Sequence, residues 1–327
     1  MIEQMKKPAI GALLALVFLV GASTFTAIGA EQRGAVAPPP AVPVPGVEIT
    51  TLKVQGNVYM LAGPGGNTTV QIGDDGVLVV DTQTQPLAPN MIAAIRKLSN
   101  KPVLWIINTD FHPEHTGGNE ALFRLSATGT GQRGRVIAHQ NVLNRITAQP
   151  VASRLPQNMW PNDAYFQASK DFSFNGEAIF VYHAGSGHTD GDSIVLFRRS
   201  DVVSTGNIFT PGLYPVIDIA NGGGIQGVID GLNKIMQLTV PLRYQEGGTY
   251  VIPGRGRICD EADVVEYRDM VTIIRDRVRD LIDKKMTLQQ VKAARPTRDY
   301  DTEYGSNTGP WTTDMFVEAV YKSLSAK

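Results

Sequence analysis

Cysteine is nearly absent from this chain, since Cys259 is the only one among its 327 residues. An intramolecular disulfide is therefore excluded, and the folded state has to be stabilised by packing rather than by covalent cross-links. A lone cysteine is more often a small buried side chain than a catalytic thiol. We therefore assign Cys259 to the core.

An excess of charge of one sign is absent as well. The 30 Lys and Arg residues nearly balance the 31 Asp and Glu residues, which leaves a formal net charge of -1. No run of basic residues forms a patch, so the sequence offers no electrostatic basis for binding nucleic acid or an anionic membrane. Glycines cluster at residues 63–66 and 222–224, but these clusters lack the Gly-Lys-Ser/Thr ending of a phosphate-binding loop and predict turns.

The apolar stretch near the N-terminus is too short to cross a membrane, because a spanning helix needs about 20 apolar residues. It covers residues 8–22, follows Lys6 and Lys7, and precedes the small residues at 27–30. This order is typical of a secretory signal peptide. We predict a signal peptide over residues 1–30, export to the periplasm or out of the cell, and no membrane association after cleavage. A membrane anchor or a buried helix is the alternative.

Residues 31–46 are rich in proline and contain almost no large apolar side chain, which predicts an extended linker. The folded domain is expected over residues 47–327, where strand and helix patterns alternate. Strands are predicted at residues 68–72, 77–80, 103–107, 178–183, 193–197, 201–204 and 249–252. Helices are predicted at residues 89–98, 226–237, 261–283, 287–292 and 313–324. Strands covered by helices on both sides indicate a layered α/β fold.

The densest group of potential metal ligands follows one of the predicted buried strands. Residues 108–119 read Asn-Thr-Asp-Phe-His-Pro-Glu-His-Thr-Gly-Gly-Asn, with Asp110, His112, Glu114 and His115 inside six positions. Imidazole and carboxylate suit zinc and other first-row divalent ions. A loop at a strand end can bring such side chains to one point, so the segment predicts a metal site. A polar loop that happens to hold two histidines is the alternative.

This segment resembles the motif Thr-His-x-His-x-Asp-His-x-Gly-Gly-Asn of the metallo-β-lactamase superfamily. Other landmarks of the superfamily occur in the expected order, at residues 76–81, 187–192, 205–209 and 251–256. The resemblance implies an αββα sandwich, here with extra C-terminal helices, and a metal site at the edge between its two sheets. It also implies a small-molecule substrate.

The resemblance assigns the metal ligands, and the first metal site keeps a usable set. The three histidines of this site in the family correspond here to Asp110, His112 and His188. Two imidazoles and one carboxylate with open positions form a known catalytic ligand set for zinc or non-haem iron. We expect one divalent metal at these residues, zinc in the first instance and iron as the alternative.

The second metal site has lost its ligand set. The family's aspartate and two histidines correspond to Glu114, His115 and Arg255, and its bridging aspartate corresponds to Asn207. A guanidinium stays protonated and cannot bind a metal, so no second metal is expected. Glu114 or His115, freed from ligation, is predicted to act as the general base. Arg255 is predicted to occupy the second metal's space and to stabilise a developing oxyanion; alternatively, it pairs with Glu114 or Asp110 and only balances the charge of an inactive site.

Four further side chains near the motifs are interpreted as supporting residues. Asp81 and Asp192 are expected to organise the loops behind the ligands. His139 and His183 are interpreted as structural histidines rather than ligands.

Three functions remain open on these observations. The first is a mononuclear metallohydrolase that cleaves an ester, lactam or thioester with a metal-activated water. The second is an inactive protein that keeps the fold and binds a ligand or partner. The third is a mononuclear iron site with redox chemistry. The pattern assigns neither a particular substrate nor an oligomeric state.

Overall fold

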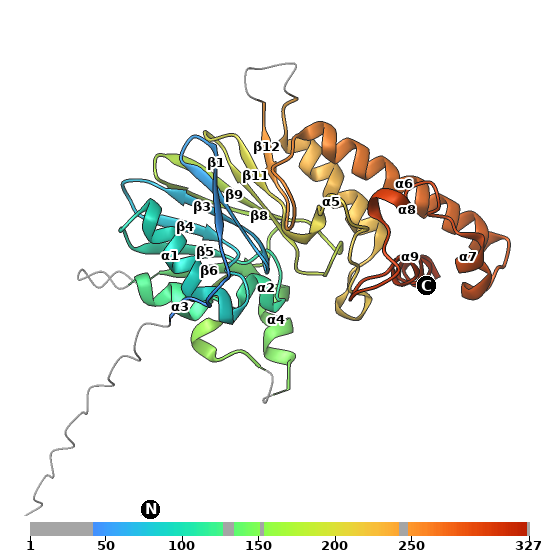
Figure 1. The fold of residues 1–327 in the computed structure, drawn as a ribbon, viewed down its shortest axis with the longest axis horizontal. Coiled ribbons are helices and arrows are strands. Elements are labelled where there is room, and N and C mark those ends of the chain that lie inside the picture. Colours follow the sequence, from blue (N-terminus) through green and yellow to red (C-terminus); the bar gives the residue numbers. More distant parts are fainter. Residues whose placement is uncertain (1–41, 127–133, 151–153, 242–247, 326–327) are drawn as a thin grey trace, which may run out of the picture. The chain divides into compact units, whose positions relative to one another are not determined.

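The computed structural model describes residues 42–126, 134–150, 154–241 and 248–325 (Figure 1). The predicted signal peptide, residues 1–30, and positions 31–41 of the predicted linker lie outside the described residues. Within the described ranges, no helix combines the length and the apolar character that a bilayer span requires.

Two β-sheets lie at the centre of the structure. The larger sheet has seven strands in chain order, β1 to β7, and the smaller has five in the order β12-β11-β10-β9-β8. The strands of the first are β1 (Thr50–Gln55), β2 (Val58–Gly63), β3 (Gly66–Ile72), β4 (Val77–Val80), β5 (Val103–Ile107), β6 (Arg135–His139) and β7 (Asp163–Tyr165). Those of the second are β8 (Ser169–Phe174), β9 (Glu177–His183), β10 (Ser193–Phe197), β11 (Val202–Ser204) and β12 (Tyr250–Ile252). Both sheets are mixed, with β4 to β7 parallel in the first and β11 parallel to β12 in the second.

Helices cover the outer face of each sheet (Figure 1). On the side of the larger sheet they are α1 (Ala88–Leu98), α2 (Pro113–Thr116), α3 (Asn119–Phe123) and α4 (Gln140–Ala148). On the side of the smaller sheet they are α5 (Ile225–Leu238), α6 (Glu261–Asp283), α7 (Leu288–Ala294), α8 (Asp301–Tyr304) and α9 (Thr313–Ser325). This is the αββα sandwich with extra C-terminal helices that the sequence predicts.

Apolar cores among the described residues hold the layers together, and strand β4 shows how. Val77 and Val79 pack on the α1 side, whereas Leu78 and Val80 pack between the two sheets. Because both faces of the strand are buried, its sequence is a continuous apolar run rather than an alternating one. Another core joins the smaller sheet to α5, α6 and α9, and Cys259 lies in it with 3% of its surface exposed. The assignment of Cys259 to the core is confirmed.

The strands and helices predicted from the sequence are all present, with ends that differ by one or two residues. The sequence analysis did not predict strands β1, β2, β6, β7 and β8 or helices α2, α3, α4 and α8. Most side chains of β1 are exposed, and those of β8 alternate mainly between exposed and half-buried positions, so neither strand shows a clear apolar pattern. The glycine cluster at residues 63–66 forms the turn between β2 and β3, as predicted.

Candidate metal centre

The predicted ligands lie on two loops at one edge of the sandwich. The first loop follows β5 and leads into α2, and the second joins β9 to β10, so each sheet contributes one loop. The first loop is fixed by Asp81, whose Oδ1 accepts the backbone N–H of Thr109 at 2.8 Å and whose Oδ2 accepts the Thr109 hydroxyl at 2.7 Å. The second is fixed by Asp192, which accepts the backbone N–H of Thr189 at 3.0 Å. Both carboxylates therefore organise the loops that carry the ligands.

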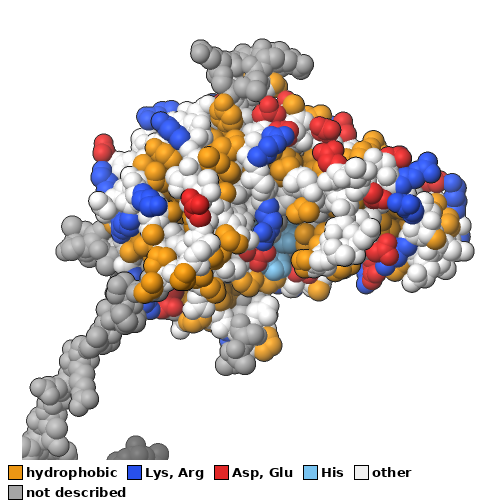
Figure 2. Space-filling model, viewed as in Figure 1, with side chains coloured by type: hydrophobic (Ala, Val, Ile, Leu, Met, Phe, Trp, Pro, Cys, Tyr) orange, Lys and Arg blue, Asp and Glu red, His pale blue; other side chains and the backbone are white. Residues whose placement is uncertain are grey.

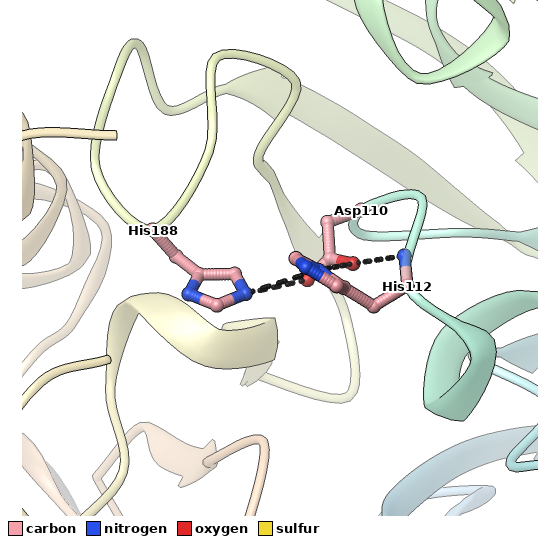
Figure 3. A group of neighbouring side chains, drawn as sticks. All are labelled: Asp110, His112 and His188. Atoms are coloured by element: carbon pink, nitrogen blue, oxygen red, sulfur yellow. Dashed lines mark hydrogen bonds and ion pairs between the residues drawn. The ribbon is translucent and has the colours of Figure 1, made fainter. Parts of the chain in front are cut away.

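Asp110, His112 and His188 point toward one another (Figure 3), and their donor atoms all lie within 4.8 Å of one another. Nδ1 of His112 lies 3.0 Å from Oδ1 of Asp110 and 3.2 Å from Nε2 of His188. Oδ2 of Asp110 lies 3.6 Å from Nε2 of His188. Donors bound at about 2.0–2.1 Å to a tetrahedral ion are roughly 3.3–3.4 Å apart. The three side chains could therefore hold one divalent metal.

In each of the two histidines, the ring nitrogen that faces away from the ligand group (the outer nitrogen) already contacts a neighbouring oxygen. The nitrogen that faces the group (the inner nitrogen) is left for a metal. Nδ1 of His188 lies 2.8 Å from the carbonyl oxygen of Val216, and Nε2 of His112 lies 3.2 Å from Oδ2 of Asp218. Such partners fix the ring orientation and the tautomer of metal-binding histidines. Burial lowers the pKa of His188, which favours the neutral form that a metal needs.

Asp218 contacts a candidate ligand and was missed by the sequence analysis. It precedes a short 3-10 helix, and its carboxylate also accepts the side-chain amide of Asn221 at 2.6 Å. No motif marks it, and it meets His112 only because the fold brings together residues 106 positions apart.

Without a metal, the carboxylates hold protons on two of the histidines. Burial by itself lowers the pKa of His112, but the hydrogen bonds and charges of Asp110 and Asp218 outweigh burial and raise it to about 10. Burial is likewise outweighed at His115, where Asp110 and Asp81 raise the pKa to about 9. Burial alone would raise the pKa of Asp110, but the surrounding histidines hold it well below its usual range.

His115 and Asn207 occupy the region of the second metal site. Nδ1 of His115 lies 2.8 Å from Oδ2 of Asp81, which points its Nε2 toward the centre. That Nε2 lies 3.2 Å from Oδ2 of Asp110 and 2.8 Å from the amide Nδ2 of Asn207. A neutral amide in direct contact with the histidine stands at the position where the resemblance places an anionic bridge.

Glu114 and Arg255, both assigned to the site from the sequence, are not paired with each other. Within the described ranges, Glu114 forms no hydrogen bond or ion pair, and its charge acts on His112 and His115 from a distance. The Nη1 atom of Arg255 donates to the carbonyl oxygen of Pro64 at 3.2 Å. Among the described residues, no ion pair joins Arg255 to Glu114 or to Asp110, so the direct pairing considered from the sequence is not formed. The catalytic roles assigned to Glu114, His115 and Arg255 stay predictions.

His139 and His183 lie away from the ligand group, and their imidazole rings stack on each other. The ring centroids are 3.7 Å apart and the planes differ by 2°. His139 ends a strand of the larger sheet and His183 ends a strand of the smaller one, so the stacked pair joins the two sheets. Nε2 of His183 lies 3.0 Å from the backbone oxygen of Asp190, in the loop that carries His188.

Residues 61–244 match the sequence model of the metallo-beta-lactamase superfamily. The chain belongs to this superfamily. The match confirms the resemblance drawn from the motifs, and the fold that surrounds the site agrees with it.

Two of the curated relatives are similar to parts of the chain. The α subunit of 2,4-dinitroanisole O-demethylase from Nocardioides sp. (strain JS1661) is 26% identical over 183 residues, which are 54% of this chain and 52% of that protein. The linear primary-alkylsulfatase of Pseudomonas sp. (strain ATCC 19151) is 30% identical over 76 residues, which are 23% of this chain and 14% of the enzyme. The chain thus spans about half the length of the first relative and less of the second.

Solved structures share the fold at low identity. A metallo-beta-lactamase from Pontibacter korlensis superposes with a TM-score of 0.55 at 16% identity, over 69% of this chain and 99% of that one. The stereoselective inverting sec-alkylsulfatase Pisa1 from Pseudomonas sp. superposes with a TM-score of 0.58 at 15% identity, over 84% of this chain and 50% of that one.

Proposed function

We propose that this chain is an exported, mononuclear metal-dependent hydrolase that cleaves an ester, lactam or thioester bond of a small molecule. The observation that carries the proposal is the group of Asp110, His112 and His188, whose donor atoms lie within 4.8 Å of one another. The outer nitrogens of both histidines are held by Val216 and Asp218, so the inner ones face a common point. Zinc suits this ligand set, and iron is the alternative.

A divalent ion in this position supplies Lewis acidity and activates water for attack on a carbonyl group. His112 keeps 23% of its side chain exposed, whereas Asp110 and His188 are almost fully buried, so solvent and substrate reach the site from the His112 side. The open side is where a reacting group has to enter.

Glu114 is the better candidate for the general base. His115 is already engaged by Asp81, and its raised pKa of about 9 keeps it protonated at neutral pH. A base must arrive unprotonated and within reach of the proton that it accepts. Glu114 is half-buried beside the ligands and, in the described part of the chain, has no hydrogen-bond partner to compete with water.

Sulfate-ester hydrolysis is a second candidate activity. The superposition with the sec-alkylsulfatase covers 84% of this chain, compared with 69% for the Pontibacter metallo-beta-lactamase. The match to a linear primary-alkylsulfatase supports the same candidate. A third possibility, a protein that keeps the fold and only binds a ligand, is separated from both by the experiment below.

The test is metal analysis of the protein purified without added metal, followed by loading with zinc or iron. We expect about one ion per chain, and its loss in His112→Ala. His139→Ala is the matched control, because it removes a histidine outside the ligand group and should leave the metal content unchanged. Absence of bound metal after loading would overturn the proposal.

Substrate screening then separates the candidate activities. Nitrocefin, simple esters and p-nitrophenyl sulfate report lactam, ester and sulfate-ester cleavage. If the metal-loaded protein cleaves none of these substrates faster than the His112→Ala variant does, the result favours the third possibility, a protein that only binds a ligand. Export is tested separately, by locating the full chain and a chain without residues 1–30 in cell fractions.

A further inference from the structure

We propose that the substrate of this site carries a fixed anionic group, a sulfate or a carboxylate, and that the guanidinium of Arg255 binds it. The inference rests on the proposed function, because it concerns the substrate of the same site. It assigns Arg255 a binding role on the substrate in place of an ion pair within the protein.

The backbone that carries Arg255 is held rigidly. The side-chain amide of Asn67 donates to the carbonyl oxygens of Pro253 and Gly256, both at 2.9 Å, and so bridges the two sides of Arg255. The backbone N–H of Asn67 donates to the oxygen of Gly254 at 2.9 Å. A loop whose backbone is already held does not have to be ordered when a ligand binds to one of its side chains. The backbone of Arg255 therefore starts from a fixed position.

This segment lies directly against the metal centre. A Cβ atom added to Gly254 would lie 2.6 Å from Oδ1 of Asn207, so only glycine allows this approach. The amide Nδ2 of the same Asn207 lies 2.8 Å from His115 and 3.4 Å from Oδ2 of Asp110. Arg255 thus directly follows Gly254, which packs against Asn207 beside the ligand group.

The guanidinium of Arg255 has donors to spare. Its hydrogen bond within the described residues is the one to Pro64, at the turn between β2 and β3, and no described carboxylate pairs with it. An arginine offers five N–H donors in a planar fork, which matches two oxygens of a sulfate or a carboxylate. Arg257, two residues away, shows the same fork in use, since its Nη1 and Nη2 atoms bind the carboxylate of Asp263 at 3.0 and 2.5 Å.

The charges around the site decide where an anion can lie. Asp110, Glu114 and Asp218 place carboxylates around His112, whereas the guanidinium of Arg255 carries a positive charge that pairs with no described carboxylate. Figure 2 shows the histidine surface in the middle of the drawn face, bordered by acidic atoms and by basic atoms. A substrate whose anionic group pairs with Arg255 can place its remaining atoms beside the metal ligands. A neutral substrate forms no ion pair with the guanidinium.

The experiment measures binding without turnover, by calorimetry at low salt on the full chain, metal-free and zinc-loaded. The probes are phenyl sulfate, benzoate and the neutral benzyl alcohol, so that the first two separate sulfate from carboxylate recognition. We expect both anions, or one of them, to bind more tightly than benzyl alcohol. In Arg255→Met that binding should weaken about tenfold or more, with a smaller loss in Arg255→Lys.

Arg257→Met is the matched control, since it removes a guanidinium from the same loop and should leave anion binding unchanged. Equal affinity of the Arg255→Met variant and the unmodified chain for both anions would overturn the inference. So would equal binding of benzyl alcohol and the anions by the unmodified chain. Failure of the proposed function is distinguishable, because metal analysis would then find no bound ion in the unmodified chain and in the Arg255 variants alike.

Discussion

Nε2 of His112 lies 3.2 Å from Oδ2 of Asp218, although the two residues are 106 positions apart. The contact turns the other ring nitrogen, Nδ1, toward Asp110 and His188. Asp218 thereby selects which nitrogen of His112 is available to a metal. Because no sequence motif contains Asp218, replacing it tests the geometry of the proposed centre independently of the motifs.

Replacing Asp218 should weaken metal binding without unfolding the protein. Asp218→Asn removes the carboxylate that orients His112, and loss of such a partner typically costs about 10–100-fold in metal affinity. A competition titration with a chromophoric chelator measures the change. Asp230→Asn, a carboxylate on the exposed side of α5, serves as the control. An affinity equal to that of the unmodified chain would show that Asp218 does not orient the ligand.

Metal binding should release protons at neutral pH. The pKa of His112 is raised to about 10 in the metal-free protein, and a metal needs its unprotonated ring. Calorimetric titrations with zinc at pH 7 in two buffers of different ionisation enthalpy give the number of protons released. We expect about one from His112, and a smaller number in the Asp218→Asn variant. An apparent enthalpy independent of the buffer would contradict the protonation described for this residue.

The stability of the metal-free protein should fall as the pH rises above neutrality. His112 and His115 have pKa values raised to about 10 and about 9, so each binds its proton more tightly in the folded state than in the unfolded one. Their contribution is fully present below pH 6.5, the ordinary histidine value, and is lost as the pH rises through 9 to 10. Thermal unfolding of the metal-free chain between pH 6.5 and 10 measures it.

The control for this pH dependence is His112→Ala, in which the decline over the same range should be shallower. His188 works in the opposite direction, because burial lowers its pKa and its protonation below pH 6.5 favours the unfolded state. A melting temperature that rises from pH 6.5 to 10 in the metal-free chain is the result that excludes this account.

Replacing Glu114 should slow catalysis while leaving the metal in place. General-base catalysis typically contributes about 10²–10⁴-fold to the rate, so Glu114→Gln should lower kcat by a factor in that range with unchanged metal content. The measurement uses whichever substrate the screen identifies, and Glu120→Gln, on α3, is the matched control. If His115→Gln lowers kcat with the metal retained and Glu114→Gln does not, the base is His115 instead.

The sequence predicts the strands and loops that carry the site better than it predicts the contacts between the side chains. Strand β5 and the loop after it were predictable, because an apolar run buried on both faces is followed by a dense ligand motif. Which side chains pair was not predictable, since charge alone also allowed Arg255 to pair with Glu114 or Asp110. In the structure its guanidinium donates to the carbonyl oxygen of Pro64, a backbone group that no side-chain pattern reveals. Asp218 was missed for the same reason, because only the tertiary fold brings it to His112.

The amide of Asn207 has a consequence for how the protein responds to metal supply. A site in which a carboxylate links two ions fills in two coupled steps, and its activity then depends on the ion concentration in a sigmoidal or two-phase manner. Here the linking position holds a neutral group in contact with His115. We expect activity to follow free zinc as a single hyperbola, with half-saturation set by the one metal site at Asp110, His112 and His188.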